Sequence, residues 1–322
     1  MFVGLTGTLA SGIDRVAGYL VNELGFRLLT LNDDTPDRSV DLNLFRSFET
    51  ITELYSFATS HWSENFVIIK DLTSSDLEKF LKRPFFLLVS VDAPIICRYE
   101  RYRKSQVDKT LTLEQFISKS EGLKYGNDCR LLQNIEKAHL KLINNSRNQE
   151  SLYKQLAALD FKDTERLRPA WDSYFMSLAN LAALRSNCMK RRVGCVIVRE
   201  NRVIATGYNG TPRKFRNCNE GGCPRCNHGD SSGVGLSTCL CLHAEENALL
   251  EAGRDRIGSS ATVYCNTCPC LTCSIKIVQT GIHEVVYSQS YSMDTLSSKV
   301  FRQSGVIIRQ FIPAKSGIVI ID

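Results

Sequence analysis

One histidine, one glutamate and two cysteines at fixed spacing constrain this chain more than any other feature. His243 and Glu245 stand two residues apart, and Cys270 and Cys273 follow in the segment Pro-Cys-Leu-Thr-Cys that begins at Pro269. An imidazole and two thiolates can supply the three protein ligands of a catalytic zinc, which keeps its fourth position open for water. A carboxylic acid that is not a ligand can then move protons. The pattern predicts that His243, Cys270 and Cys273 hold Zn²⁺ and that Glu245 is the catalytic acid–base.

The local structure predicted around the histidine agrees with this interpretation. Residues 244–251 have a helical composition, and Gly253 is a suitable C-terminal stop. Residues two apart in the middle of a helix do not share a face. We therefore expect His243 and Glu245 in the first turn, where both can reach one cavity.

The cysteine pair is expected at the start of a second helix. Pro269 suits the first helical position, which would make Cys270 and Cys273 neighbours at i and i+3. A helix N-terminus favours the thiolate, which is the form that binds zinc. A lone Cys-x-x-Cys could instead be a redox pair or half of a structural zinc site. Its combination with His-x-Glu is the signature of zinc-dependent nucleobase deaminases.

Composition narrows the class of protein. The chain has 322 residues, 43% of them hydrophobic, which is enough for two ordinary domains. No apolar run has membrane-spanning length, and the N-terminus lacks the features of a signal peptide. The thirteen cysteines then favour thiols and metal ligands over disulfides. The net charge of +6 suits a phosphorylated small molecule and does not demand nucleic acid. We expect a protein of the cytoplasm, or also of the nucleus, that is not secreted and binds no membrane.

The distribution of cysteines predicts two domains. Only Cys97 and Cys129 precede residue 188, and the other eleven lie from Cys188 to Cys273. The polar segment 160–169 ends in proline and is a candidate linker. The prediction is one domain over residues 1–160 and a second over residues 161–322.

Residues 161–322 read as alternating helices and strands. Asp172 is expected to cap a helix that extends to residue 184. A tight turn at residues 200–201 predicts a hairpin, and the whole pattern predicts a sheet of about five strands with helices on both faces. The expected strands are 193–199, 202–206, 261–265, 284–288 and 306–311.

Residues 1–160 open with FVGLTGTLASG at positions 2–12, which predicts a strand, a glycine-rich turn and then a helix. This segment resembles the phosphate-binding loop of P-loop kinases, the dephospho-coenzyme A kinases above all. FFLLVSVDAP at 85–94 is similar to a later strand of that fold. Ile13 and Asp14 stand where the motif requires Lys and then Ser or Thr. The expected structure is a degenerate P-loop α/β domain that serves as scaffold, although its backbone could still hold an anion.

Residues 171 to about 311 closely resemble the deoxycytidylate deaminase family. The resemblance is carried by WDSYFM at 171–176, RRVGC at 191–195, GYNG at 207–210, HAEENALL at 243–250 and YCNTCPCLTC at 264–273. With the N-terminal extension included, the whole chain is similar to the fungal form. The resemblance implies the αβα cytidine-deaminase fold and hydrolysis of dCMP to dUMP and ammonia, which supplies dUMP for dTMP synthesis. It also implies activation by dCTP, inhibition by dTTP and a homo-hexamer.

Further site residues follow from the resemblance alone. Asn209 matches an asparagine that contacts the sugar, and Tyr291 matches a tyrosine beside the base. Arg254 falls where relatives have an arginine near the allosteric nucleotide. Each also has an ordinary structural interpretation: an Asn-Gly turn, an amphipathic surface residue and a cation near a helix C-terminus. The basic residues 190–192 either help to hold the 5′-phosphate or are a solvated charge run.

The resemblance also suggests a second, structural zinc. Some relatives have one, and its ligands there match Cys188, Cys218 and Cys241. The fourth ligand could be Cys223, Cys226 or Cys239. Of the remaining histidines, only His228 lies next to these cysteines.

Two alternatives to dCMP deamination remain at this stage. The first is a deaminase of another cytosine- or adenine-type substrate; for a polynucleotide substrate we expect a basic groove interleaved with aromatic residues, and the sequence shows no such stripe. The second, of a different class, is a zinc-stabilised nucleotide-binding module without catalysis. Glu245 distinguishes them, because a closed structural site has no use for a proton carrier.

Overall fold

The computed structural model describes residues 1–32, 44–105, 110–229, 234–235, 238–290, 294–312 and 317–322, which form two compact units. The first runs from Met1 to Arg168 and includes the C-terminal strand β12 (Gly317–Ile321), and the second begins at Pro169. The expected division at residue 160 therefore needs correction at two places. Phe161 is fully buried in the core of the first unit, and β12 pairs in parallel with β6 (Leu140–Asn144) of that unit.

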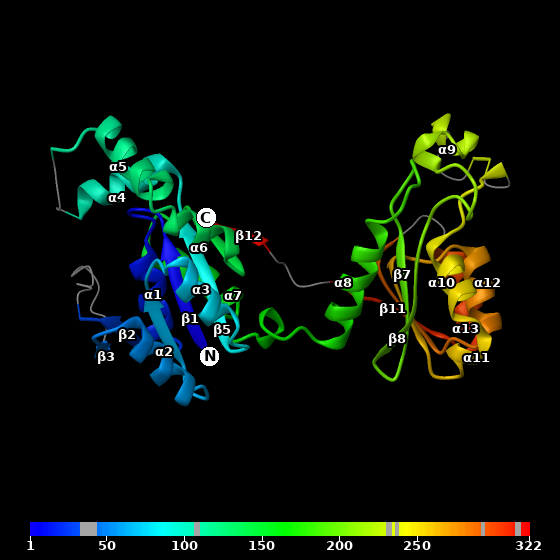
Figure 1. Ribbon diagram of the computed structural model, residues 1–322, viewed down its shortest axis with the longest axis horizontal. Helices are drawn as coiled ribbons and strands as arrows, with labels where there is room; N and C mark the ends of the chain where they lie inside the picture. The colour runs from blue at the N-terminus through cyan, green and yellow to red at the C-terminus, as the bar shows by residue number, and fades with distance from the viewer. Residues whose placement is uncertain (33–43, 106–109, 230–233, 236–237, 291–293, 313–316) are drawn as a thin grey trace. The chain divides into compact units, whose positions relative to one another are not determined.

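The first unit is built on a seven-stranded parallel sheet in the order β12-β6-β5-β1-β4-β2-β3 (Figure 1). Its two faces carry separate cores, because neighbouring strand residues point to opposite sides. Val3 of β1 packs with α1 and α7 on one face, and Phe2 packs with α2 and α3 on the other. In chain order the elements are β1 (Phe2–Gly7), α1 (Ile13–Asn22), β2 (Arg27–Leu31), β3 (Leu44–Phe48), α2 (Ile51–Ser60), β4 (Phe66–Ile69), α3 (Ser74–Leu81), β5 (Phe86–Asp92), α4 (Ile95–Lys104), α5 (Leu113–Tyr125), α6 (Arg130–Lys137), β6, α7 (Gln149–Ala158) and β12.

The second unit contains the expected five-stranded sheet, in the order β11-β10-β9-β7-β8. β7 runs antiparallel to β8 and β9, whereas β9, β10 and β11 are parallel. Among the described residues of both units, no helix is long and apolar enough to cross a membrane. The elements are α8 (Trp171–Ala183), β7 (Gly194–Arg199), β8 (Arg202–Tyr208), α9 (Pro224–Asn227), α10 (Ala244–Ala252), α11 (Arg254–Ile257), β9 (Thr262–Thr267), α12 (Leu271–Thr280), β10 (Glu284–Gln289), α13 (Asp294–Ser304) and β11 (Ile307–Gln310).

Alternation along the strands makes this unit a three-layer sandwich. Val196 and Tyr264 pack with α8, whereas Cys195 and Val263 pack with α10, α12 and α13. Figure 1 shows α8 on one face of the sheet and these three helices on the other. The hairpin turn lies where the sequence predicts it, at residues 200–201, which both have the left-handed conformation that such turns require. This sandwich is the expected αβα arrangement.

Asp172 does not cap a helix, in contrast to the sequence prediction. Helix α8 begins one residue earlier, at Trp171. The Asp172 carboxylate instead accepts hydrogen bonds from the Tyr264 hydroxyl at 2.8 Å and from Arg309 Nη1 at 2.6 Å. Arg309 also donates to Glu284 at 2.7 Å. This network joins α8 to three strands of the sheet.

Replacing Asp172 with Asn should lower the free energy of unfolding at pH 7 by about 1 kcal/mol, the upper end for a partly exposed ion pair. Arg309 holds the pKa of Asp172 below its usual range. The carboxylate therefore contributes stability above its unfolded pKa of about 3.9, and this contribution disappears as the pH falls through the lower folded value. The difference between wild type and variant should shrink accordingly in urea titrations from pH 7 to pH 3.

Tryptophan fluorescence can report this unit alone. The chain has two tryptophans, and Trp171 stacks on Phe175 beside Asp172. A Trp62→Phe background leaves Trp171 as the only reporter. Asp255→Asn, at an exposed position of α11, is the matched control and should change little. A stability difference that stays constant over the whole pH range would contradict the assignment.

Candidate metal centre

The predicted zinc ligands meet at the N-termini of two helices. His243 is the N-cap of α10, Cys270 is the N-cap of α12, and Cys273 lies in the first turn of α12. Pro269 precedes the cap and is not the first helical residue, so the predicted start of this helix was early by two residues. His243 Nδ1 lies 3.4 Å from each of the two sulfur atoms.

These distances fit a tetrahedral metal. With Zn–S and Zn–N bonds of about 2.3 and 2.05 Å, a ligand sulfur and nitrogen stand about 3.6 Å apart. The donor atoms of His243, Cys270 and Cys273 all lie within 4.8 Å of one another. One nitrogen and two sulfurs, with no fourth donor in the group, are the set expected of a catalytic zinc.

The two cysteines differ in their protonation. The hydrogen bond with Cys273 lowers the pKa of Cys270 to about 3, and the contact with His243 acts in the same direction. The same hydrogen bond raises the pKa of Cys273. Cys270 is therefore a thiolate at neutral pH, which is the form that binds a metal.

Glu245 lies in the first turn of α10 and is only 4% exposed. Burial raises the pKa of its carboxyl to about 7, and it shares a hydrogen bond with Cys273. A carboxyl whose pKa is near neutral can both accept and donate a proton under physiological conditions. Glu246, the next residue, is partly exposed and forms an ion pair with Lys276 of α12 at 2.6 Å.

A glycine that the sequence analysis did not single out holds α10 against the sheet. A β-carbon at Gly207 of β8 would lie 2.2 Å from the Ala244 carbonyl oxygen and 2.5 Å from the Ala248 nitrogen. The backbone of α10 therefore approaches β8 more closely than any side chain permits. Gly207 stands in the Gly-Tyr-Asn-Gly segment, where it reads as a turn residue, so local pattern did not reveal this role.

The cysteines suspected of holding a second metal also gather. Cys188, Cys218 and Cys241 lie close together with Cys226 as a fourth sulfur. A second group of four shares Cys226 and Cys241 with the first and adds Cys223 and Cys239. His228 is exposed and lies outside both groups.

The structure describes two of the three residues that the family resemblance implicated in nucleotide binding. Asn209 is buried, and its Oδ1 accepts hydrogen bonds from Ser186 Oγ and the Val193 amide at 2.7 and 2.8 Å. Its Nδ2 donates to the Arg191 carbonyl at 2.8 Å, so the amide holds two loops together. Arg254 is exposed at the start of α11. Tyr291 lies outside the described residues.

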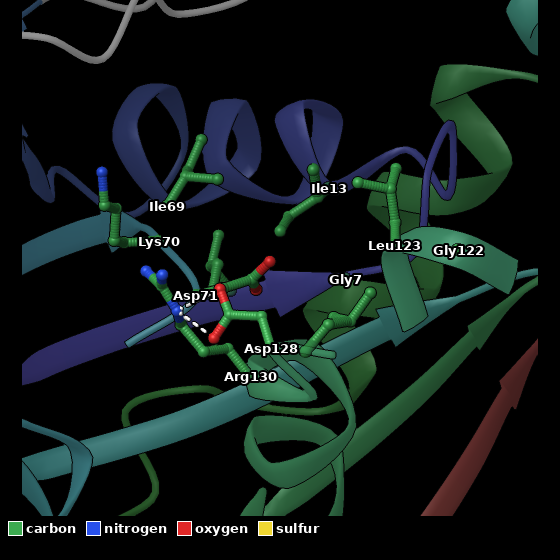
Figure 2. A pocket seen from close by; sticks show the side chains of 11 residues that line it. Gly7, Ile13, Ile69, Lys70, Asp71, Gly122, Leu123, Asp128 and Arg130 are labelled. Carbon is green, nitrogen blue, oxygen red and sulfur yellow. Dashed lines mark hydrogen bonds and ion pairs between the residues drawn. The ribbon is translucent and has the colours of Figure 1, made fainter. Parts of the chain in front are cut away.

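The first unit has a separate pocket of about 490 Å³ at the ends of β1 and β4 (Figure 2). The apolar side chain of Ile13, which follows the glycine-rich turn, lines this pocket. Two carboxylates, Asp71 and Asp128, lie in the opposite wall, and Arg130 pairs with Asp128 at 2.6 Å. Lys70 also lines the pocket, so its lining carries two acidic and two basic side chains.

Known proteins share the sequence that builds the metal centre. The family model of the cytidine and deoxycytidylate deaminase zinc-binding region matches residues 169–289. Deoxycytidylate deaminase of Schizosaccharomyces pombe is 51% identical, covering 98% of this chain and 99% of its own length. That of Saccharomyces cerevisiae is 52% identical, covering 97% and 96%. The crystal structure of dCMP deaminase from the cyanophage S-TIM5 with dCMP and dUMP is 30% identical, with a TM-score of 0.38 over 45% of this chain and 98% of that one. The two yeast relatives match both units, whereas the family model lies within the second.

Replacing Gly207 with Ala should disturb the metal centre from beneath. The new methyl group meets backbone atoms of α10, so the helix must move, and we expect a loss of roughly 1–3 kcal/mol of stability from overpacking. Displacement of His243 should also weaken zinc retention during dialysis against a chelator. The control is Gly122→Ala, an exposed glycine of α5 with no atom near its β-carbon position. Unchanged stability and zinc content in Gly207→Ala would contradict this account of the helix–sheet contact.

Proposed function

Because this chain belongs to the deoxycytidylate deaminase family, we propose that it hydrolyses dCMP to dUMP and ammonia, with its second unit as the catalytic unit. The observation that carries this proposal is the buried carboxyl of Glu245 beside the three convergent donor atoms of His243, Cys270 and Cys273. The identity of 51% and 52% to the two yeast enzymes, over nearly the whole length of each chain, supports the same substrate. Deamination replaces the amino group at C4 of cytosine with oxygen from water.

The residues of the centre have separate tasks. His243, Cys270 and Cys273 would hold the zinc, which activates water for attack near neutral pH. Glu245 would accept a proton and would deliver protons to the ring and to the departing amine. Its buried position excludes bulk water, and its pKa of about 7 suits repeated proton transfer in both directions.

Recognition of the nucleotide is part of the same proposal. Asn209 would contact the sugar through the Nδ2 proton that is not donated to the Arg191 carbonyl. Tyr291 would lie beside the base. The basic residues 190–192 would hold the 5′-phosphate. Activation by dCTP, inhibition by dTTP, a role for Arg254 in binding these effectors and a hexameric assembly are further parts of the proposal, supported only by resemblance to the family. We place the enzyme in the cytoplasm or nucleus, where its thiols stay reduced, and its dUMP would serve dTMP synthesis.

The first unit is proposed to be a degenerate P-loop kinase-like scaffold. Support comes from the order of β1, glycine-rich turn and α1, and from a parallel sheet with helices on both faces. Protein groups satisfy one carbonyl of the turn: Arg101 Nη1 and Asn144 Nδ2 both donate to Ser11 O, at 3.0 and 2.9 Å. Ile13 has no group that could reach a phosphate, and Asp14 cannot replace the hydroxyl that binds magnesium.

Glu245→Gln should retain the fold and the zinc but lose deaminase activity by several orders of magnitude. Acid–base catalysis alone contributes roughly 10²–10⁴-fold, and loss of water activation adds to this. The matched control is Glu246→Gln, which changes the adjacent carboxyl that faces Lys276 and should leave kcat within a few fold of wild type. Ammonia release from dCMP, cytidine and CMP measures both activity and specificity. Near-normal turnover by Glu245→Gln would refute the catalytic role.

The first unit should have no kinase activity. Purified full-length protein is expected neither to hydrolyse ATP nor to phosphorylate dephospho-coenzyme A above background, since the lysine and the magnesium-binding hydroxyl are both missing. The control is Gly12→Ala, which introduces a β-carbon at a residue with φ of +88° and only 2.7 Å from Asn144 Nδ2. ATPase activity in the wild type that disappears in Gly12→Ala would overturn the scaffold interpretation.

A further inference from the structure

Six cysteine sulfurs form one compact cluster outside the catalytic centre. Two sets of four, each with all sulfurs within 4.8 Å, have Cys226 and Cys241 in common. Cys188 and Cys218 belong only to the first set, and Cys223 and Cys239 only to the second. The cluster gathers the segment after α8, the short helix α9 and the segment that leads into α10.

The spacing of the sulfurs is that of metal ligands. Zinc–sulfur bonds of about 2.3 Å at tetrahedral angles place the sulfurs about 3.8 Å apart. Four sulfur–sulfur distances match this edge: 3.9 Å for Cys188–Cys226, 3.9 Å for Cys223–Cys239, 3.7 Å for Cys226–Cys239 and 4.0 Å for Cys226–Cys241. A disulfide would require about 2.05 Å, and all these cysteines are free thiols.

We propose that the six cysteines hold two zinc ions in a binuclear thiolate cluster, in which Cys226 and Cys241 bridge the metals. A single ion in either set would leave two cysteines of the other set without a metal, although their sulfurs stand at ligand spacing. Two tetrahedra that share the Cys226–Cys241 edge use every sulfur. Sites closed on four sulfurs are structural, because they leave no position for water.

The surroundings suit a cluster that carries negative charge. Six thiolates and two zinc ions leave a net charge of about −2. The guanidinium of Arg225 is buried, and its Nη1 lies 3.8 Å from Cys239 Sγ. Backbone amides also donate to the sulfurs, Met189 N to Cys218 and Leu240 N to Cys223, both at 3.4 Å. Such hydrogen bonds stabilise thiolate ligands.

The cluster would fix the approach to the catalytic helix. Cys241 and the zinc ligand His243 are separated only by Leu242, whose backbone pairs with Gly210 next to β8. Metal binding at Cys241 therefore restrains the N-cap of α10. The cluster takes no part in the chemistry, so its presence can be tested independently of deaminase activity.

Wild-type full-length protein should contain three zinc ions per chain and no iron by elemental analysis, one at the catalytic centre and two in the cluster. After exchange into ¹¹³Cd²⁺, two resonances typical of four-sulfur coordination should appear, coupled to each other through the shared sulfurs. A total of two zinc ions, uncoupled resonances or stoichiometric iron would overturn the binuclear proposal. None of these measurements requires a variant that folds.

Single substitutions distinguish the two tetrahedra. Cys188→Ser and Cys239→Ser should each lower the zinc content from three to two, since each removes a ligand of one metal only. Cys241→Ser should remove both cluster metals and leave one. The control is Cys97→Ser, in the first unit, which should retain three. A wild-type zinc content in either Cys188→Ser or Cys239→Ser would show a single-metal site.

The catalytic centre can be separated from this result. Cys270→Ala should lose the catalytic zinc and yet keep the two coupled cadmium resonances. Should the deaminase proposal fail while the coupled pair remains, the cluster stands on its own. Loss of the coupled pair in Cys270→Ala would contradict the independence of the two sites.

Discussion

The close contact between α10 and the β7–β8 hairpin is the constraint on which the second unit depends. Gly207 lets the helix backbone lie directly on β8, and Asn247 Nδ2 donates to the Tyr208 carbonyl at 3.0 Å. Because α10 begins immediately after His243, anchoring the helix to the sheet also places the imidazole and the Glu245 carboxyl. Helices α10 and α12 share one hydrophobic core, to which Ala248 and Ile277 both belong. The metal centre is therefore held by rigid elements, which keeps its geometry precise.

Environment explains how two neighbouring glutamates of one helix differ. Glu245 is buried beside the metal ligands, and burial raises its pKa to about 7. Glu246 faces Lys276 at the surface of the pair of helices, where it serves packing and charge. A separation of one residue is enough to place the two carboxyls in different surroundings, because the helix points successive side chains in different directions. Burial, and not residue type, distinguishes the two carboxyls.

Much of the second unit could be predicted from sequence because its signals are local. The His-x-Glu and Pro-Cys-x-x-Cys spacings, the turn at residues 200–201 and the stop at Gly253 each depend on a few neighbouring residues. Long-range partners could not be read in this way. Asp172 is a residue of a type that often caps helices, yet its carboxylate binds Arg309 of strand β11. Strand β12 likewise pairs with β6 of the first unit, a partner that lies far from it in the sequence. Gly207 resembles a turn residue until the helix above it is seen.

The grouping of the cysteines is the clearest case of a feature that required the three-dimensional structure. The family resemblance left Cys223, Cys226 and Cys239 as alternatives for the fourth ligand of a single metal. In three dimensions all of them lie at ligand distance, and Cys226 and Cys241 belong to both sets. The alternatives were therefore members of one cluster. A site closed on four sulfurs can only restrain the chain. Three donors at His243, Cys270 and Cys273 would instead leave one position of a tetrahedral metal for water, with Glu245 beside it. Since a single residue separates Cys241 from His243, the restraint acts on the ligand that the chemistry requires.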